Sequence, residues 1–187
     1  MTSQDGAIAA LFRLTHQFRI DAAGLPIASN SMADAGALYR AGRVDAAEQL
    51  CREMIAGDPR HAEALHLLGV ICCDRNATDE ALKWLSRAVA VAPENPRVHY
   101  HLGNALMAAE GFSEAEGEFR QAVALDPALA DAFNNLGSTL GSQQRDREAI
   151  DAYGQALALR PRMPRALYNM GLAQARIGDL ESAIASH

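Results

Sequence analysis

Proline, glycine and alanine recur along this chain at one fixed interval, which is the same for all three residue types. The positions are Pro59, Pro93, Pro127 and Pro161; Gly69, Gly103, Gly137 and Gly171; and Ala47, Ala81, Ala115, Ala149 and Ala183. Because three residue types keep one register without an insertion, the chain is predicted to be a tandem array of one structural unit.

Each period is predicted to form two helices. In the first half, apolar or small residues return with the spacing of one helix face. These positions are Leu65, Leu68, Gly69 and Cys72, then His99, Leu102, Gly103 and Leu106, then Phe133, Leu136, Gly137 and Leu140. In the second half, small residues flank one large residue, namely Leu85, Phe119 or Tyr153. A glycine inside a helix costs roughly 1 kcal/mol in propensity, so we expect it to permit close approach of the partner helix.

Local signals predict where these helices begin and end. Asp45 with Glu48, and Ser113 with Glu116, have the spacing of an N-cap residue and its acidic partner. Each recurrent proline disfavours helix at the residue before it and should end the second helix. Pro96 should open the first helix of a unit, where a missing N–H has no cost.

The composition favours helices and excludes several functional classes. The chain is rich in alanine and only 5% aromatic, which predicts an all-α protein without a sheet. The net charge is −6, so the basic footprint of a nucleic-acid binder is missing. No apolar run approaches the roughly 20 residues that span a membrane, and the first residues do not resemble a secretory signal. Cys51, Cys72 and Cys73 form no disulfide framework, so we expect a cytoplasmic protein.

The repeat resembles the tetratricopeptide-repeat (TPR) family, whose units of about 34 residues are helix–turn–helix pairs. The resemblance is carried by the alanine, large residue, alanine, proline series of each second helix and by Leu68-Gly69, Leu102-Gly103, Leu136-Gly137 and the variant Met170-Gly171. It covers residues 28–187. It implies a right-handed α-solenoid that acts as a scaffold for a protein or peptide partner.

The expected units are 28–61, 62–95, 96–129, 130–163 and 164–187. In the first unit, Ser31 and Asp34 stand where large apolar residues are expected, so its first helix should pack weakly. In the last unit, Gln174 replaces an apolar residue and the chain stops at His187, within an expected helix. Repeat arrays usually need a polar-faced terminal cap. The chain is therefore expected to be a fragment of a longer protein, or to pair through this end with another subunit.

Residues 1–27 lie outside the repeat and are predicted to form a short amphipathic helix followed by a linker. The apolar residues of that helix are Ile8, Leu11, Phe12, Leu14, Phe18 and Ile20. Two roles stay open for this segment. It packs on the first unit as an N-terminal cap, or it serves self-association or fills the groove of the array.

The resemblance implies that the first helices line a concave groove, on the face opposite the Leu-Gly stripe. Tyrosine, asparagine and arginine on this face can stack on a peptide and hydrogen-bond to its backbone or to a carboxylate. The predicted peptide-binding residues are His66, Arg97, Tyr100, Asn104, Met107, Asp131, Asn134, Asn135, Ser138, Arg165, Tyr168 and Asn169.

One pattern within the family concerns a carboxylate ligand. Chaperone adaptors of this family grip a C-terminal carboxylate with basic and asparagine residues. Asn104, Asn135 and Arg165 stand at matching places. Tyr100 and Asn169, however, stand where basic residues are expected, so only part of that pattern is present.

A second pattern concerns a larger enzyme. The repeat arms of O-linked N-acetylglucosamine transferases carry an asparagine ladder, in which Asn135 and Asn169 would be two rungs. His101 and Leu67 break that ladder. The alternative that follows is a substrate-recruiting arm of a glycosyltransferase-like enzyme. A third alternative is a self-assembling structural module.

No set of residues predicts an active site, a metal site or a cofactor site. His66 and Cys73 lie about 10 Å apart along one helix axis, too far for a thiol–imidazole pair. His99 and His101 point in different directions, so they do not chelate one metal ion. His99 replaces the apolar residues of the other units and is predicted to be packed inside. We therefore predict that the chain is not an enzyme.

Overall fold

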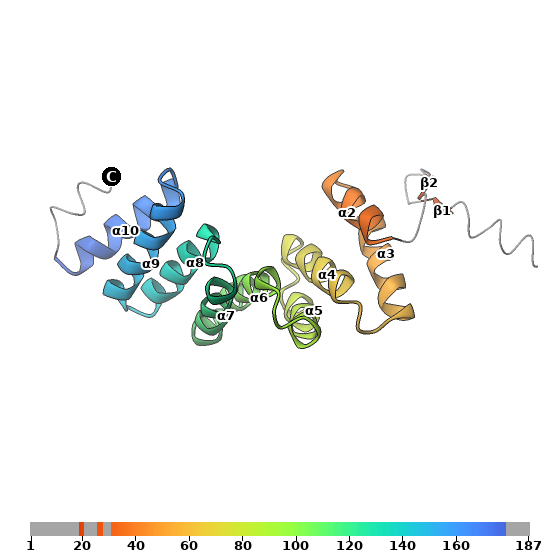
Figure 1. The fold of residues 1–187 in the computed structure, drawn as a ribbon, viewed down its shortest axis with the longest axis horizontal. Coiled ribbons are helices and arrows are strands. Elements are labelled where there is room, and N and C mark those ends of the chain that lie inside the picture. Colours follow the sequence, from red (N-terminus) through yellow and green to blue (C-terminus); the bar gives the residue numbers. More distant parts are fainter. Residues whose placement is uncertain (1–18, 21–25, 28–30, 179–187) are drawn as a thin grey trace, which may run out of the picture.

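The computed structural model describes residues 19–20, 26–27 and 31–178, and in these residues the helices follow one another as an elongated array (Figure 1). Each helix packs on its neighbours in sequence. The helices are α2 (Met32–Arg40), α3 (Val44–Gly57), α4 (Ala62–Asp74), α5 (Thr78–Val91), α6 (Pro96–Ala108), α7 (Phe112–Leu125), α8 (Ala130–Ser142), α9 (Asp146–Leu159) and α10 (Pro164–Arg176).

The helix boundaries follow the period of the sequence repeat. The first helices α4, α6, α8 and α10 begin at residues 62, 96, 130 and 164, and the second helices α3, α5, α7 and α9 begin at residues 44, 78, 112 and 146. Each of these second helices ends shortly before a recurrent proline, and Pro96 is the first residue of α6, so both proline predictions are confirmed. The predicted all-α solenoid is confirmed.

A residue with positive φ follows the first helix of every unit, and this recurrence was not predicted. Gly42, Asn76, Glu110, Gln144 and Gly178 have φ values of 75°, 57°, 60°, 60° and 84°. They recur with the period of the repeat, but their types differ. Glycine adopts this conformation freely, whereas an ordinary side chain there costs about 1–2 kcal/mol. The turn geometry is therefore kept even where the residue type does not favour it.

The glycines of the first helices mark equivalent close contacts with the second helices, as expected. A Cβ atom placed on them would lie only 2.5, 2.7 and 2.7 Å from the side chain opposite. The contact pairs are Gly69 with Leu85, Gly103 with Phe119, and Gly137 with Tyr153. All three large side chains are buried, so each fills the space that the missing glycine side chain leaves.

The predicted N-caps of two second helices are wrong. Asp45 is the second residue of α3 and Ser113 is the second residue of α7, so both lie inside the helix. The residues that do occupy these N-cap positions make no side-chain capping bond. Glu48 and Glu116 lie on the helix surface and bind arginines instead.

Ser31 and Asp34 begin the first helix of the array rather than replace core residues. Ser31 is the N-cap of α2, and its Oγ accepts a hydrogen bond of 3.2 Å from the backbone N–H of Asp34. The Asp34 side chain reaches back to the Ser31 backbone, which completes a capping box. α2 is shorter than the other first helices, and it still buries Ala35 and Leu38.

One short strand pair precedes the array, so the prediction of no sheet is wrong outside residues 31–178. β1 (Arg19–Ile20) and β2 (Pro26–Ile27) are antiparallel, with Arg19 opposite Ile27. The prediction that Ile20 belongs to an amphipathic helix is therefore wrong, and Pro26–Ile27 pairs where a linker is expected. The remaining residues of that predicted helix, and the predicted second helix of the last unit, lie outside the described residues.

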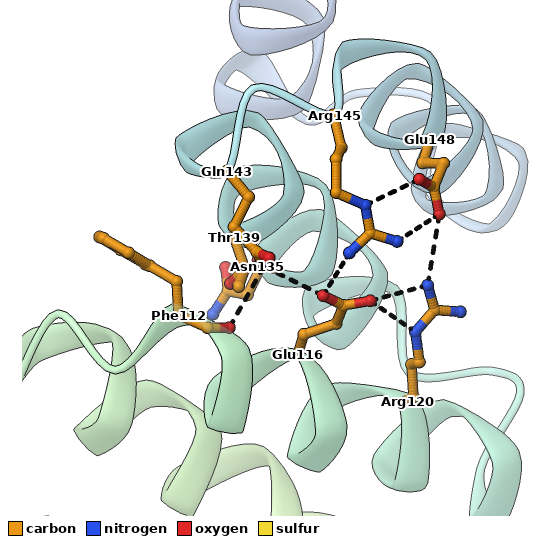
Figure 2. A network of polar contacts seen from close by, with 8 residues as sticks. All are labelled: Phe112, Glu116, Arg120, Asn135, Thr139, Gln143, Arg145 and Glu148. Carbon is orange, nitrogen blue, oxygen red and sulfur yellow. Dashed lines mark hydrogen bonds and ion pairs between the residues drawn. The ribbon is translucent and has the colours of Figure 1, made fainter.

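An ionic cluster joins the third unit to the fourth (Figure 2). The Glu116 side chain on α7 accepts hydrogen bonds from Arg120 at 2.9 Å, Gln143 at 3.0 Å and Arg145 at 2.6 Å. Arg145 also donates to Glu148 at 2.6 Å. Burial opposes ionisation of Glu116, but these three donors outweigh it and lower its pKa. The carboxylate is therefore charged at neutral pH.

A matching cluster joins the first unit to the second. Glu48 accepts hydrogen bonds from Arg52 and Arg75, and Arg52 also contacts Glu80. Glu48, Arg52 and Glu80 precede Glu116, Arg120 and Glu148 by two full periods of the repeat. The matching clusters therefore lie at the first and third joints between units, whereas the helix packing recurs at every joint.

Candidate peptide-binding groove

The first helices form the inner side of the array. First helices of successive units contact one another directly, as in α4 with α6, α6 with α8 and α8 with α10. In the described part of the chain the second helices make no contact of this extent with one another. The first helices therefore lie on the concave side of the array, where the groove was predicted.

One open pocket on this side, called the main pocket below, has a volume of about 810 Å³ and lies between α6, α8 and the segment that connects α9 to α10. It brings together seven of the twelve predicted peptide-binding residues. They are Tyr100, Asn104, Met107, Asp131, Asn134, Asn135 and Arg165.

A chain of asparagine side chains forms the floor of this pocket. The Asn134 amide nitrogen donates to Asn135 at 2.9 Å, and the Asn135 amide nitrogen donates to Asn104 on the neighbouring first helix at 2.7 Å. Asn134 is only 8% exposed, and its Oδ1 has no hydrogen-bond partner within the part of the chain that the structure describes. This row of hydrogen-bonded asparagine side chains thus ends in an unpaired acceptor, which costs free energy when no ligand or water supplies a donor.

The connector between α9 and α10 supplies two arginines to the pocket, Arg160 and Arg162, that were not predicted. Arg160 forms a two-bond ion pair with Asp131, with distances of 2.9 and 3.0 Å. Arg162 and Arg165 are exposed and form no ion pair within residues 31–178. A local signal was available, because the stretch RPRMPR at 160–165 holds three arginines and the corresponding stretches of the other units hold at most one.

Ser138 and Asn169 lie in a second pocket, of about 390 Å³, one unit farther along the array. The Asn169 amide and the Tyr153 hydroxyl donate to the Ser138 hydroxyl at 3.4 and 3.2 Å. Tyr168 is 55% exposed on α10. These predicted residues therefore do not share the main pocket.

His66 and Arg97 also lie outside the main pocket. His66 on α4 packs against His101 on α6, with ring centroids 5.0 Å apart, and His101 contacts Tyr100 at 5.1 Å. Burial lowers the pKa of His66 to about 4, and the charges of His101 and Arg97 act in the same direction. Burial lowers the pKa of His101 as well. The pair is therefore neutral at physiological pH and joins the second unit to the third.

The predicted interior position of His99 is confirmed. His99 is 6% exposed, and its two ring nitrogens lie 2.6 Å from Glu118 and 2.8 Å from the Pro93 carbonyl oxygen. Burial raises the pKa of Cys51 to about 12 and that of Cys72 to about 11, so these two side chains are protonated thiols at neutral pH.

The described residues contain neither a cluster of metal-ligating side chains nor a membrane-spanning helix. In these residues no three histidine, cysteine, aspartate or glutamate side chains gather so that they could hold a metal ion. Likewise, none of the described helices is both long and apolar enough to cross a lipid bilayer.

Comparison with protein families explains this architecture. Three models of the tetratricopeptide repeat match residues 38–100, 100–146 and 140–178, without a gap between them. The chain belongs to the tetratricopeptide-repeat family. No curated protein matches the sequence of this TPR array.

Several solved TPR structures are similar to this array. A crystal structure of MamA is 26% identical, with a TM-score of 0.76, and the match covers 81% of this chain and 89% of MamA. YrrB, described as a TPR protein with an unusual peptide-binding site, is 22% identical, with a TM-score of 0.74, and 83% of this chain and 80% of YrrB are covered. PilF of Pseudomonas aeruginosa is 20% identical, with a TM-score of 0.74, and 83% of this chain and 71% of PilF are covered.

Proposed function

We propose that this TPR array is a protein-interaction scaffold that holds an extended peptide segment of a partner protein in the pocket between α6, α8 and the α9–α10 connector. Family membership supports the general role of binding another protein. The observation that carries the finer proposal is that seven of the predicted groove residues line one open pocket. The fold also accommodates such a site in YrrB, whose description names a peptide-binding site.

The chemistry of the pocket suits a peptide. Its volume of about 810 Å³ lies in the range of ordinary ligand sites. Asn104 and Asn135 present amides that match the donors and acceptors of a peptide backbone. Tyr100 offers a flat apolar face, and Met107 can adapt to side chains of different shape. The scaffold therefore acts by holding its partner and not by transforming it.

An array of random ten-residue peptides, tethered through their C-termini, tests this proposal. The wild-type protein should bind a subset of the peptides. Tyr100→Ala and Asn104→Ala should each weaken that binding about tenfold, since each removes a contact at the centre of the pocket. Gln155→Ala, an exposed residue on the second helix α9, is the matched control and should bind like the wild type. All variants should retain the helical circular-dichroism spectrum.

Two results would count against the groove. In one, the wild-type protein captures no peptide from the array. In the other, Tyr100→Ala and Asn104→Ala bind as well as Gln155→Ala, which would place the binding surface elsewhere on the molecule.

A further inference from the structure

The charges around the pocket point to the partner's chemistry. Resting on the function proposed above, we infer that the pocket selects an acidic peptide segment, whose internal aspartate or glutamate side chains bind Arg162 and Arg165 while its backbone lies on the asparagine floor.

The pocket has the opposite charge from the chain that carries it. The protein has a net charge of −6. The pocket, in contrast, is lined by Arg160, Arg162 and Arg165 and by a single acidic residue, Asp131. Positive charge on the wall of a cleft attracts an anionic partner and repels a cationic one.

The three arginines do not play the same part. Both terminal nitrogens of Arg160 bind the two carboxylate oxygens of Asp131, at 2.9 and 3.0 Å, so this guanidinium is already paired. Arg162 stands immediately before Met163–Pro164 and Arg165 immediately after it, where the connector enters α10. Both are exposed and without an ion pair in residues 31–178. Their guanidinium groups remain to bind a carboxylate through paired hydrogen bonds.

The floor of the pocket indicates how the peptide backbone would lie. Asn134 is 8% exposed, and its Oδ1 has no hydrogen-bond donor among the described residues. At the other end of the amide chain, Asn104 accepts from Asn135, and its own amide nitrogen donates to no described residue. The Asn134 oxygen is itself buried, so the floor offers a peptide backbone the Asn104 amide nitrogen as a donor.

The position of the arginines separates this site from a grip on a chain terminus. Arg160 and Arg162 lie on the connector between two units, beyond the helix face that carries Asn104 and Asn135. Several charges spread along a connector suit several acidic side chains of an internal segment. Because Arg160 is already paired with Asp131, Arg162 and Arg165 provide two guanidinium groups, whereas a chain terminus brings a single carboxylate.

The tethered peptide array also tests this inference. Its peptides have no free C-terminal carboxylate, so a preference for acidic peptides must come from their internal side chains. Captured peptides should be enriched in aspartate and glutamate. Arg162→Gln and Arg165→Gln should each weaken the best acidic peptide about fivefold, and the double variant more than about tenfold. Arg147→Gln, which removes an exposed arginine from the second helix α9, is the charge-matched control and should leave binding unchanged.

Two further arms sharpen the result. In one arm, each aspartate and glutamate of the best peptide is replaced by asparagine or glutamine. This change should lower the affinity about as much as the double arginine variant lowers it for the original peptide. Asp131→Asn should strengthen acidic peptides severalfold, because it releases the Arg160 guanidinium and removes the one negative charge of the pocket.

The inference is overturned if peptides bind in the groove without acidic enrichment, or if the amide version of the peptide binds as tightly as the acidic one. The groove proposal would survive either result. A single-stranded oligonucleotide that displaces the acidic peptide at lower concentration would also overturn the inference, in favour of a phosphate ligand. Capture of no peptide at all would remove both proposals together.

Discussion

Replacing Gly103 by alanine tests the close contact on which the stacking of the array depends. A Cβ atom at this position would lie 2.7 Å from Cε1 of the Phe119 ring and 2.9 Å from Cδ1 and Cζ. Phe119 is 0% exposed, so its ring has no open space to move into. The added methyl group therefore has to displace the ring or separate α6 from α7.

The size of the effect follows from two opposing terms. Overpacking a close contact in a protein core costs about 1–3 kcal/mol. Alanine also has a better helix propensity than glycine, which returns about 1 kcal/mol. We expect Gly103→Ala to lower the free energy of unfolding by up to about 2 kcal/mol.

Gly117 is the matched control, because it lies inside the neighbouring helix α7 and has nothing within 4 Å of a Cβ atom. Gly117→Ala should stabilise the protein by about 0.5–1 kcal/mol through helix propensity alone. Urea unfolding followed by far-UV circular dichroism measures both. The Gly103→Ala penalty should disappear when Phe119 is also replaced by alanine, as expected for two coupled positions. Equal stabilisation by Gly103→Ala and Gly117→Ala would refute the reasoning.

Two further predictions concern titration and the ionic cluster. Burial, with the charges of His101 and Arg97, lowers the pKa of His66 to about 4 from 6.5, so the unfolded chain binds the proton first as the pH falls. Stability should therefore be highest above pH 6.5 and decrease by about 3 kcal/mol as the pH falls towards 4. Urea titrations would detect this slope. His66→Gln should reduce it and leave the part due to His101, whose pKa burial also lowers. Glu116→Gln should cost about 1–2 kcal/mol in the same assay, because the side chain is 14% exposed and has three donors. Glu148→Gln should cost clearly less, because that side chain is 50% exposed and its ion pairs are screened by water. Equal losses for the two glutamates would show that burial does not set the strength of the cluster.

The parts of the fold that the sequence predicted are those in which one residue type is physically required. A proline disfavours helix at the residue before it whatever its tertiary surroundings, and a glycine is needed where two helices meet as α6 and α7 do at Gly103. The left-handed turn recurs with the same period but accepts Gly42, Asn76 or Glu110. Because the cost there is only about 1–2 kcal/mol, the packing of the two helices outweighs it, and no residue type reveals the turn.

The capping signals misled because one spacing has two meanings. Residues three apart form a capping box at a helix start, and they also lie side by side on the surface of a helix that has already begun. For Asp45 and Glu48 the helix begins before the pair, and their carboxylates bind arginine. Only the position of the neighbouring unit decides between these alternatives.

The candidate site was predicted from the family resemblance rather than from periodicity alone. Asn104 was placed on the inner face by that resemblance and Asn135 was proposed from the asparagine patterns of the family, and the structure joins them by a hydrogen bond of 2.7 Å. Arg160 and Arg162 were missed because they lie on a connector, whose path over the mouth of the pocket depends on how successive units are rotated. A repeat pattern fixes the helices but not that rotation.

The helix packing and the ionic clusters together define where the pocket is rigid. Packing must be equivalent at every joint for the array to continue, whereas ion pairs on its surface need not be, and here the matching clusters lie two periods apart. Among the described side chains, no ion pair joins the second unit to the third, while the Glu116 cluster joins the third to the fourth. The pocket spans the third and fourth units as far as the start of α10. At its floor, the backbone carbonyl oxygen of Asn135 accepts a hydrogen bond of 2.8 Å from Thr139, which lies beside the cluster (Figure 2). A cluster that fixes α7 against α8 and α9 also fixes the distance from the asparagine floor to the arginines of the connector. If the pocket binds a peptide as proposed, the ionic cluster would contribute by preorganisation, without touching the peptide.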